Sequence, residues 1–507
     1  MFASATNRMR RGRTVTTSPT MILAFICIAQ FMVFIDVSIV NLALPSIQDG
    51  LAMPDVSLNY VVTAYATVLG GFLLLGGRLA DTFGRRRILQ IGFVVFALAS
   101  LAAGLAQSGA VLIAARGFQG LGSSFIAPAA LSILTSTFPE GPQRNRALGI
   151  WGSLGGIASI VGVILGGVLA GGPGWEWIFG INVPIGLAVA AFAPRVLVES
   201  TAPQRRDGRF DVAGAATLTS ALLLLIFTLG EATNVGWATF RTVGSLLAVG
   251  VLLAVFVAIE SRSASPLMPL TVFRLKTMRT ANISAVLVFG TFAAMFFFVS
   301  LFMQQVYGYS PMVAGFGYVP LGVAVAAGST IASMLITKVT ARSVLVAGLV
   351  ITVAGLLLLW RAPVEGSYLI NLLPAFVALG TGCGMCFVTL QIAAFVGITE
   401  REAGLGAGLI NTSQEAGGAL GLAAVATIAY NGIAAELAAA GTDPASVRAV
   451  HAAATHDAFL AAACLGVIAL LLVVFVMPHA KPARNQHATG EDRETAPTTE
   501  PAMLDAA

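Results

Sequence analysis

The sequence predicts an all-α membrane protein with fourteen transmembrane helices. Hydrophobic residues make up 57% of its 507 residues and charged residues only 10%, whereas about 25% of an ordinary soluble domain is charged. The mean hydropathy is +0.88. Apolar windows of about 20 residues, long enough to cross a bilayer, recur along the chain. Almost all lysine and arginine residues fall in the loops that would lie on one side of the membrane.

The first six helices are predicted from apolar windows with short breaks between them. The break between the fifth and sixth is the run Gly171-Gly172-Pro173-Gly174, which disfavours a continuous helix. The six windows are 21–44, 58–77, 88–106, 110–134, 147–170 and 177–193.

Eight further windows follow. Two lie in the middle of the chain, at 212–230 and 242–259, after a polar stretch that contains Arg205, Arg206 and Arg209. The last six are 281–302, 313–336, 343–360, 368–390, 403–429 and 458–477. The Ala-rich segment 430–457, between the last two, is expected to be partly helical.

The positions of the basic residues predict the orientation. Short loops rich in lysine and arginine stay in the cytoplasm, because moving them across a bilayer is unfavourable. With the N-terminus placed inside, only Arg241, Arg361 and Arg448 fall in outside loops, and Arg116 lies within a span. We therefore expect a multi-pass protein of the cell membrane with both termini in the cytoplasm. We see no cleavable signal peptide.

Residues 77–87 (GRLADTFGRRR) are predicted to form a short cytoplasmic loop between the second and third helices. Their spacing resembles the same loop of the major facilitator superfamily of secondary transporters. The resemblance implies a gate on the cytoplasmic face, formed by Gly77, Asp81, Gly84, Arg85 and Arg86. In this reading Asp81 can meet a helix N-terminus near Ala403, where the helix dipole favours an anion. The alternative is a basic anchor that only sets topology.

Three charged residues lie inside predicted spans: Asp36, Arg116 and Glu415. A charge at the centre of a bilayer costs roughly 2.5–3.5 kcal/mol on insertion scales, so it needs a partner or a function. Burial raises the pKa of a carboxyl group, and a nearby arginine lowers it. A carboxylate whose arginine contact changes during transport can therefore gain and lose a proton. The alternative for Asp36 and Arg116 is a fixed ion pair that only orients two helices.

Five further motifs resemble the 14-helix drug:proton antiporters of this superfamily. They are residues 34–45 (FIDVSIVNLALP), 116–122 (RGFQGLG), 177–186 (WIFGINVPIG), 308–311 (GYSP) and 406–412 (GAGLINT). The resemblance implies two six-helix bundles with two extra helices between them. The sequence departs from the family pattern in the fifth helix. There Gly162-Val163 stands where a Gly-Pro pair usually precedes two glycines.

The resulting domain prediction has five parts. These are a cytoplasmic N-tail (1–19), an N-terminal bundle (20–195), a linker with the two extra helices (196–277), a C-terminal bundle (278–478) and a disordered cytoplasmic tail (479–507). Gln119 and Gly120, in the R-x-x-Q-G motif of the fourth helix, are added to the gating residues.

The family resemblance implies proton-driven export of amphipathic drugs or antibiotics. The rival hypothesis is import or export of one small metabolite by the same fold. Aromatic and thioether residues near 295–307 suit varied apolar ligands, although they can equally face lipid or the core. The candidate cavity residues are Asn41, Tyr65, Phe297, Gln304, Tyr307 and Asn411.

Other classes of function find little support in the sequence. No P-loop or nucleophile–base set is present, so we expect no enzyme activity, and the loop-bound basic residues argue against a nucleic-acid partner. Cys383 and Cys386 form a C-x-x-C pair, which we interpret as helix packing because no further ligand lies nearby. We expect no metal and no cofactor, a monomer in the bilayer, and energy from the proton gradient.

Overall fold

The computed structural model describes residues 18–199, 211–263, 266–398, 402–430, 433–441 and 443–478. Within these ranges the only regular secondary structure is helical, which confirms the predicted all-α class. Residues 1–17 of the predicted N-tail and all of the predicted C-terminal tail, 479–507, lie outside these ranges.

The first half of the chain forms α1 (Pro19–Leu51), α2 (Asp55–Phe83), α3 (Arg85–Gly104), α4 (Gly109–Thr137) and α5 (Pro142–Gly171). The sixth predicted helix is divided into α6 (Glu176–Gly180) and α7 (Asn182–Val196). The predicted loop at 77–87 is wrong in extent. Helix α2 continues to Phe83, and Gly84 alone separates it from α3, with a φ of 110° that favours glycine.

The two extra helices are α8 (Val212–Val235) and α9 (Phe240–Glu260), as predicted. Side chains cap both N-termini. Asp211 accepts a hydrogen bond from the Gly214 N–H, and Thr239 accepts one from the Thr242 N–H. A short 3-10 helix, η1 (Leu270–Arg274), leads from α9 into the second half of the chain.

The second half begins with α10 (Lys276–Leu301), which continues as the π-helical segment η2 (Phe302–Val306). The remaining elements are α11 (Pro311–Gly317), α12 (Val319–Leu335), α13 (Ala341–Trp360), the π-helical η3 (Tyr368–Leu372), α14 (Leu373–Ala394), α15 (Ala403–Ala429), α16 (Ile433–Ala440) and α17 (Pro444–Val476). The expectation of helix in 430–457 is confirmed, because α16 and the first turns of α17 occupy most of it.

Among the described residues, thirteen helical segments are long and apolar enough to cross a membrane. The fourteenth predicted span, α15, is a continuous helix of 27 residues but is not among the thirteen. It carries Asn411, Thr412, Ser413, Gln414 and Glu415 in succession. Helix α15 is nevertheless covered on several sides, because it packs against α2, α4, α8, α10 and α17.

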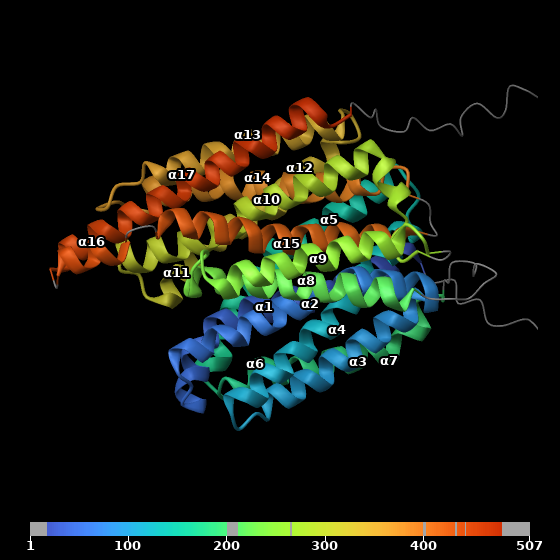
Figure 1. The fold of residues 1–507 in the computed structure, drawn as a ribbon, viewed down its shortest axis with the longest axis horizontal. Helices are drawn as coiled ribbons and strands as arrows, with labels where there is room; N and C mark the ends of the chain where they lie inside the picture. The colour runs from blue at the N-terminus through green and yellow to red at the C-terminus, as the bar shows by residue number, and fades with distance from the viewer. Residues whose placement is uncertain are drawn as a thin grey trace, which may run out of the picture.

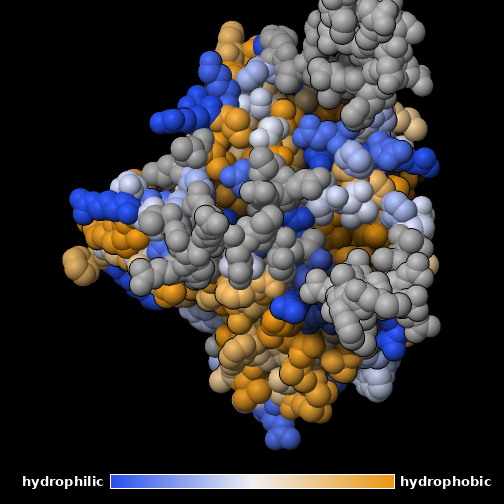
Figure 2. Space-filling model, turned by 90° about the vertical axis from the view of Figure 1, so that its right-hand side faces the viewer, coloured by the Kyte–Doolittle hydropathy of each residue, from blue (hydrophilic) through white to orange (hydrophobic). Residues whose placement is uncertain are grey.

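The helices form two groups with the extra pair between them (Figure 1). Helices α1–α7 pack with one another in one group, and α10–α17 in the other. The groups meet mainly where α2 contacts α15 and where α5 contacts α12. Both ends of the described chain lie at the same end of the bundle (Figure 1), which we call the Asp81 end. Hydrophilic side chains are scattered over this end, and the lower flank is hydrophobic (Figure 2).

Candidate functional site

The first candidate site is a buried ion pair between α1 and α4. Arg116 Nη1 lies 2.6 Å from Asp36 Oδ2. Asp36 is 0% exposed and Arg116 is 1% exposed, so neither charge reaches solvent or lipid. Desolvation of two charges is costly, and such a pair persists only when further polar groups complete its hydrogen bonding.

Two amides complete the hydrogen bonding of Asp36. Gln119 Nε2 donates to Asp36 Oδ1 at 3.2 Å, and Asn182 Nδ2 donates to the same oxygen at 2.9 Å. Gln119 Oε1 accepts from Arg116 Nη1 at 3.0 Å, while its Nε2 also donates to Ser100 Oγ at 2.6 Å. Both oxygens of Asp36 therefore accept hydrogen bonds from donors that are themselves buried.

The guanidinium of Arg116 has additional partners on α2. Its Nε donates to the Val61 carbonyl at 3.1 Å, and its Cζ lies 4.3 Å from the centre of the Tyr65 ring. This distance is typical of a cation–π contact. The Tyr65 hydroxyl in turn donates to Ser123 Oγ on α4 at 2.9 Å. Gly120 lets the two helices approach, since a Cβ there would lie 2.4 Å from the Tyr65 carbonyl oxygen.

We call Asp36, Ser100, Arg116, Gln119 and Asn182 the Asp36 network. It joins α1, α3, α4 and α7, and Arg116 extends it to α2. The structure thus places Gln119, which we had expected at the gate, beside Asp36. Any change in the charge of Asp36 acts on at least four helices at once.

The second candidate site joins the two halves at the Asp81 end. Asp81 Oδ1 accepts from the Gly404 N–H at 3.0 Å, and Oδ2 accepts from the Leu405 N–H at 2.9 Å. These N–H groups belong to the first turn of α15, where the sequence analysis expected Asp81 to bind. A carboxylate in this position satisfies free N–H groups and interacts favourably with the helix dipole.

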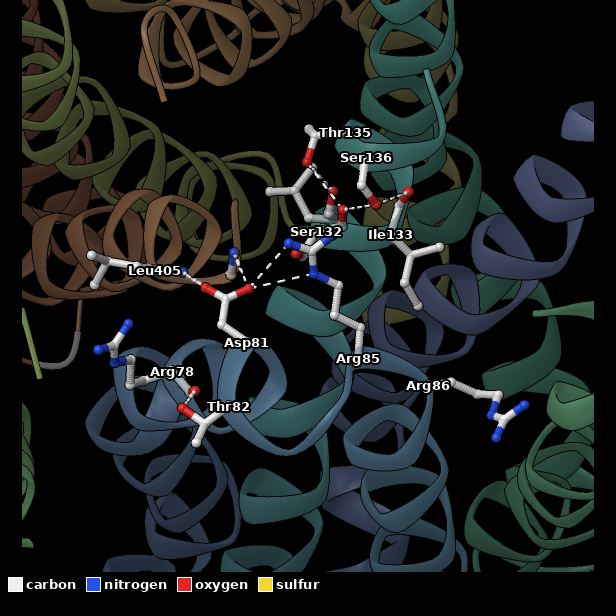
Figure 3. Close-up of polar contacts among 12 residues, drawn as sticks. Arg78, Asp81, Thr82, Arg85, Arg86, Ser132, Ile133, Thr135, Ser136 and Leu405 are labelled. Carbon is white, nitrogen blue, oxygen red and sulfur yellow. Dashed lines mark hydrogen bonds and ion pairs between the residues drawn. The ribbon is translucent and has the colours of Figure 1, made fainter. Parts of the chain in front are cut away.

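Arg85 completes this contact from the first turn of α3. Its Nη2 donates to Asp81 Oδ1 at 3.2 Å, and both side chains are buried. In Figure 3 the guanidinium lies between Asp81 and the C-terminal part of α4, whereas Arg78 and Arg86 point away. We call Asp81, Arg85, Gly404 and Leu405 the latch.

The glycines at the latch allow close contact between α2 and α15. A Cβ at Gly77 would lie 2.1 Å from the Gly404 carbonyl oxygen, and one at Gly404 would lie 2.4 Å from the Gly77 carbonyl oxygen. Real Cβ atoms do not approach oxygen so closely, so any larger residue would push the helices apart. Gly77 therefore allows the close contact of α2 with α15 beside Asp81.

Arg86 and Gly84 do not reach the other half. The Arg86 N–H donates to Glu199 Oε1 at 3.1 Å, and Arg86 Nη1 donates to the Leu197 carbonyl at 3.3 Å. A Cβ at Gly84 would meet Glu199 Oε1 at 2.6 Å. These contacts tie α3 to the segment after α7, within the first half, so Arg86 and Gly84 support the latch without forming it.

The third predicted charge, Glu415, is not a hydrogen-bonded member of the Asp36 network. It is half-buried on α15, with its Cβ 3.4 Å from the Cβ position of Gly70 on α2. Among the residues that the structure describes, it forms no ion pair. Asn411, one turn earlier, is also half-buried.

Several of the predicted cavity residues already have partners in the structure. Tyr65 belongs to the surroundings of Arg116, and Phe297 is 42% exposed. Gln304 donates to Ser300 Oγ at 2.8 Å, and the Tyr307 hydroxyl donates to the Pro363 carbonyl at 3.2 Å. Asn41 lies in α1, but its side chain is outside the described part of the structure. The prediction missed the tertiary contacts that already occupy Tyr65 and Tyr307.

A hollow of about 520 Å³ lies near Tyr307 but is lined by other residues. The lining residues are Tyr309, Val313, Phe316, Gly317, Val319, Pro320 and Tyr368. Such a volume is within the range of small-molecule sites. None of the six predicted cavity residues is among these seven.

Sequence reasoning assigned no role to Ser100, Asn182 or Glu199. Asn182 stands inside the quoted motif 177–186, and a polar amide in an apolar span was the signal that could have identified it. Ser100 and Glu199 gave no comparable signal, because a serine in a helix and an acid in a polar loop are common. Only their contacts with Gln119 and Arg86 reveal their roles.

The cysteines form no disulfide in the described part of the chain. All four are free, and Cys386 packs against α13, where a Cβ at Gly348 would lie 3.0 Å from its Sγ. Among the described residues, no group of three or more His, Cys, Asp or Glu side chains is placed to hold a metal ion.

Comparison with known proteins identifies relatives along most of the chain. The sequence model described as Major Facilitator Superfamily matches residues 26–422. The puromycin resistance protein pur8 of Streptomyces alboniger is 36% identical over 435 residues, which are 84% of each protein. The cephamycin export protein CmcT of Amycolatopsis lactamdurans is 37% identical over 438 residues, 85% of this chain and 88% of CmcT. The lincomycin resistance protein of Streptomyces lincolnensis is 35% identical over 425 residues, which are 83% of this chain and 85% of that protein.

Two solved structures share the fold. The crystal structure of the human organic anion transporter MFSD10 (TETRAN) aligns with a TM-score of 0.64 and 13% identity, covering 90% of this chain and 99% of that one. The proton:xylose symporter XylE, bound to 6-bromo-6-deoxy-D-glucose, aligns with a TM-score of 0.63 and 13% identity. The alignment covers 92% of this chain and 97% of XylE.

Proposed function

The chain belongs to the Major Facilitator Superfamily, and on this basis we propose that it exports amphipathic drugs or antibiotics in exchange for protons, by alternating access. It is a multi-pass membrane transporter, not an enzyme. Export is supported by the names of its relatives, which are resistance and export proteins for puromycin, cephamycin and lincomycin.

The buried Asp36–Arg116 pair is the observation that carries the proposed proton coupling. The atoms that contact the Asp36 carboxylate are Arg116 Nη1, Gln119 Nε2 and Asn182 Nδ2, and all three are donors. Oδ1 accepts from both Gln119 and Asn182, so a proton added to Oδ1 has to displace one of these donors, whereas a proton added to Oδ2 weakens its charge-assisted hydrogen bond from Arg116. Protonation also removes the negative charge that holds Arg116, so the network rearranges.

This rearrangement supplies the coupling between proton and substrate. A ligand shifts a conformational equilibrium only by binding one state better than the other. Protonated Asp36 favours a helix arrangement without the Arg116 contact, and ionised Asp36 favours the arrangement described above. A substrate that binds one of these arrangements better is thereby linked to the proton.

The latch supports alternating access. In the present structure α2 and α15 are in contact at the Asp81 end, so this end of the seam between the halves is closed. A transporter of this kind also needs a state in which the end is open, and the hydrogen bonds from Asp81 to Gly404 and Leu405 then have to break.

The basic residues support a cytoplasmic Asp81 end. Arg85, Arg86, Arg144 and Lys338 lie there, whereas Arg448 lies at the opposite end. The proposed arrangement is a monomer in the cell membrane with both termini in the cytoplasm, driven by the proton gradient without a cofactor.

Two measurements test the proposal. Expression in a host that lacks its own drug pumps is expected to raise the minimum inhibitory concentration of at least one amphipathic antibiotic in a broad panel. Everted vesicles are expected to accumulate that compound when they are energised, and a protonophore should abolish the accumulation. Accumulation in intact cells instead would indicate an importer and contradict the proposal.

A further inference from the structure

The extra helix α8 lies along the line where the two halves meet. It packs on α2 and on α15 along the seam that the latch closes. The fit to α2 is close, since a Cβ at Gly71 would lie 2.5 Å from Leu223 Cδ2. Beyond the end of α8, Trp237 Nε1 donates to Thr427 Oγ1 of α15 at 2.5 Å. Figure 1 shows α8 and α9 between the two helix groups.

The segment after α9, residues 266–275, is fastened to the same seam by two polar contacts. Arg78 Nη2 of α2 donates to the Pro266 carbonyl at 3.1 Å. Glu260, the last residue of α9, accepts from the Met268 N–H at 2.5 Å and is 4% exposed. We call residues 266–275 the strap. Arg78 lies three residues before Asp81, and its side chain points away from the latch (Figure 3).

Apolar side chains of the strap bridge the two halves. Leu267, Met268 and Val272 are buried in one cluster with residues of both groups of helices. The other members are Leu74 of α2, Ala215, Leu218 and Leu222 of α8, Phe256 of α9, Met278 of α10, and Leu405 and Leu409 of α15. Leu405 is also the residue whose N–H binds Asp81. The strap therefore shares a buried apolar cluster with a component of the latch.

We infer that the strap and the α8–α9 pair form a brace that stabilises the closed latch, with Arg78 and Glu260 as its positioning residues. The inference rests on the alternating access proposed above. When the Asp81 end opens, α2 and α15 have to separate, so the apolar cluster that contains the strap and residues of both helices has to divide. Both polar contacts hold the strap to the side of α2 and α9. The end of the strap continues into α10 of the second half, so the brace joins the two halves, and opening has to loosen the packing of α8 on α2 or on α15.

The test measures the separation of the two halves directly. Spin labels are attached at the Asp81 end to Gln143→Cys on α5 and Lys338→Cys after α12, which are both exposed. The background carries serine in place of Cys27, Cys383, Cys386 and Cys464. Double electron–electron resonance of the purified protein in lipid nanodiscs measures the distance between the two spin labels. The result is expressed as the ratio of molecules with a long distance to molecules with a short one. Arg78→Ala and Glu260→Ala should each raise this ratio by roughly fivefold or more, the lower range of allosteric coupling.

Conservative variants separate positioning from general damage. Glu260→Gln keeps an oxygen that accepts from Met268, and Arg78→Lys keeps a donor for Pro266. Both should stay close to wild type. Arg262 is exposed and lies two residues after Glu260, so Arg262→Ala removes a charge at the surface. This variant should leave the ratio unchanged. Asp81→Ala, which removes the latch itself, should open the end and serves as the positive control.

The outcomes distinguish this inference from the proposed function. If Asp81→Ala opens the end but Arg78→Ala and Glu260→Ala do not, the brace is wrong and alternating access stands. If Arg262→Ala opens it as much as Arg78→Ala, the effect is one of charge and the inference fails. If no variant, Asp81→Ala included, changes the distances, alternating access at this end is wrong and the brace fails with it.

Discussion

At the scale of single residues, three acidic side chains with different surroundings are candidates for a role in transport. Asp36 faces three buried donors, Asp81 faces two backbone N–H groups and an arginine, and Glu415 forms no ion pair in the described part of the chain. Among the three, only Asp36 is both sealed from solvent and linked to several helices by side chains. This makes it the strongest candidate for the proton site.

The first prediction concerns Asp36→Asn. Asparagine has nearly the same shape but cannot alternate between charged and neutral forms, so proton-driven efflux should fall to background while the protein remains in the membrane. Efflux of a fluorescent substrate from preloaded cells measures this. Asp49→Asn, an exposed substitution on the same helix, is the control and should behave as wild type. Efflux by Asp36→Asn at the wild-type rate would disprove the coupling role.

The second prediction concerns Arg116→Lys. Lysine keeps the charge but cannot donate to Val61 and Asp36 together or stack as a planar group on Tyr65. The loss of a hydrogen bond from a charged group, about 1.5–3 kcal/mol, should slow transport by roughly tenfold or more.

Initial efflux rates in proteoliposomes, with a set pH gradient, provide the measurement for Arg116→Lys. Arg146→Lys, exposed near the start of α5, is the matched control. If Arg116→Lys transports as fast as Arg146→Lys, the geometry of the guanidinium is unimportant and charge alone suffices.

At the scale of helices, glycine determines how closely the two halves approach. Gly77 and Gly404 contact each other at the α2–α15 crossing, and Gly156 and Gly322 do so at the α5–α12 crossing, where a Cβ at Gly156 would lie 2.3 Å from the Gly322 carbonyl oxygen. Both crossings join different halves. Close approach of helix backbones through small residues is a common packing mode in membranes.

The third prediction is that Gly77→Ala weakens the closed state. The added methyl group would overlap the Gly404 carbonyl oxygen, so α2 and α15 have to separate and the Asp81 hydrogen bonds lengthen. A cysteine at Ser136, near the latch on α4, should then react several times faster with a water-soluble maleimide. Gly250→Ala on α9, where a Cβ would meet nothing within 4 Å, is the control. Equal reaction rates in the two variants would contradict the proposed role of Gly77.

At the scale of the whole molecule, the two ends of the helix bundle differ in their content of basic residues. The latch, the strap and most of the described basic residues lie at the Asp81 end, and the α16–α17 hairpin lies at the other (Figure 1). The positive-inside rule therefore predicts that the Asp81 end faces the cytoplasm.

The fourth prediction tests this orientation. In the cysteine-free background, Arg448→Cys should react with a membrane-impermeant maleimide in intact cells, and Gln143→Cys should react only after the cells are permeabilised. Both side chains are exposed, so access across the membrane decides the result. The reverse pattern would show that the Asp81 end faces outward.

The sequence by itself determined the class of fold, the positions of the spans and the charges of interest. A long apolar window has few alternatives to a helix, because its backbone polar groups need internal hydrogen bonds in lipid. A charge within such a window is visible without a structure, and so Asp36, Arg116 and Glu415 could be identified. The binding of Asp81 near Ala403 was also expected, but from the family resemblance and not from periodicity.

Only the tertiary structure decided which of these residues act together. Asn182 and Ser100 join the Asp36 network, Arg86 contacts only its own half, and Tyr65 and Tyr307 already have hydrogen-bond partners. Sequence patterns report how a residue relates to its own helix, whereas these contacts link helices that are distant in the chain. Their partners depend on how whole helices cross, and that is set by packing over many residues at once.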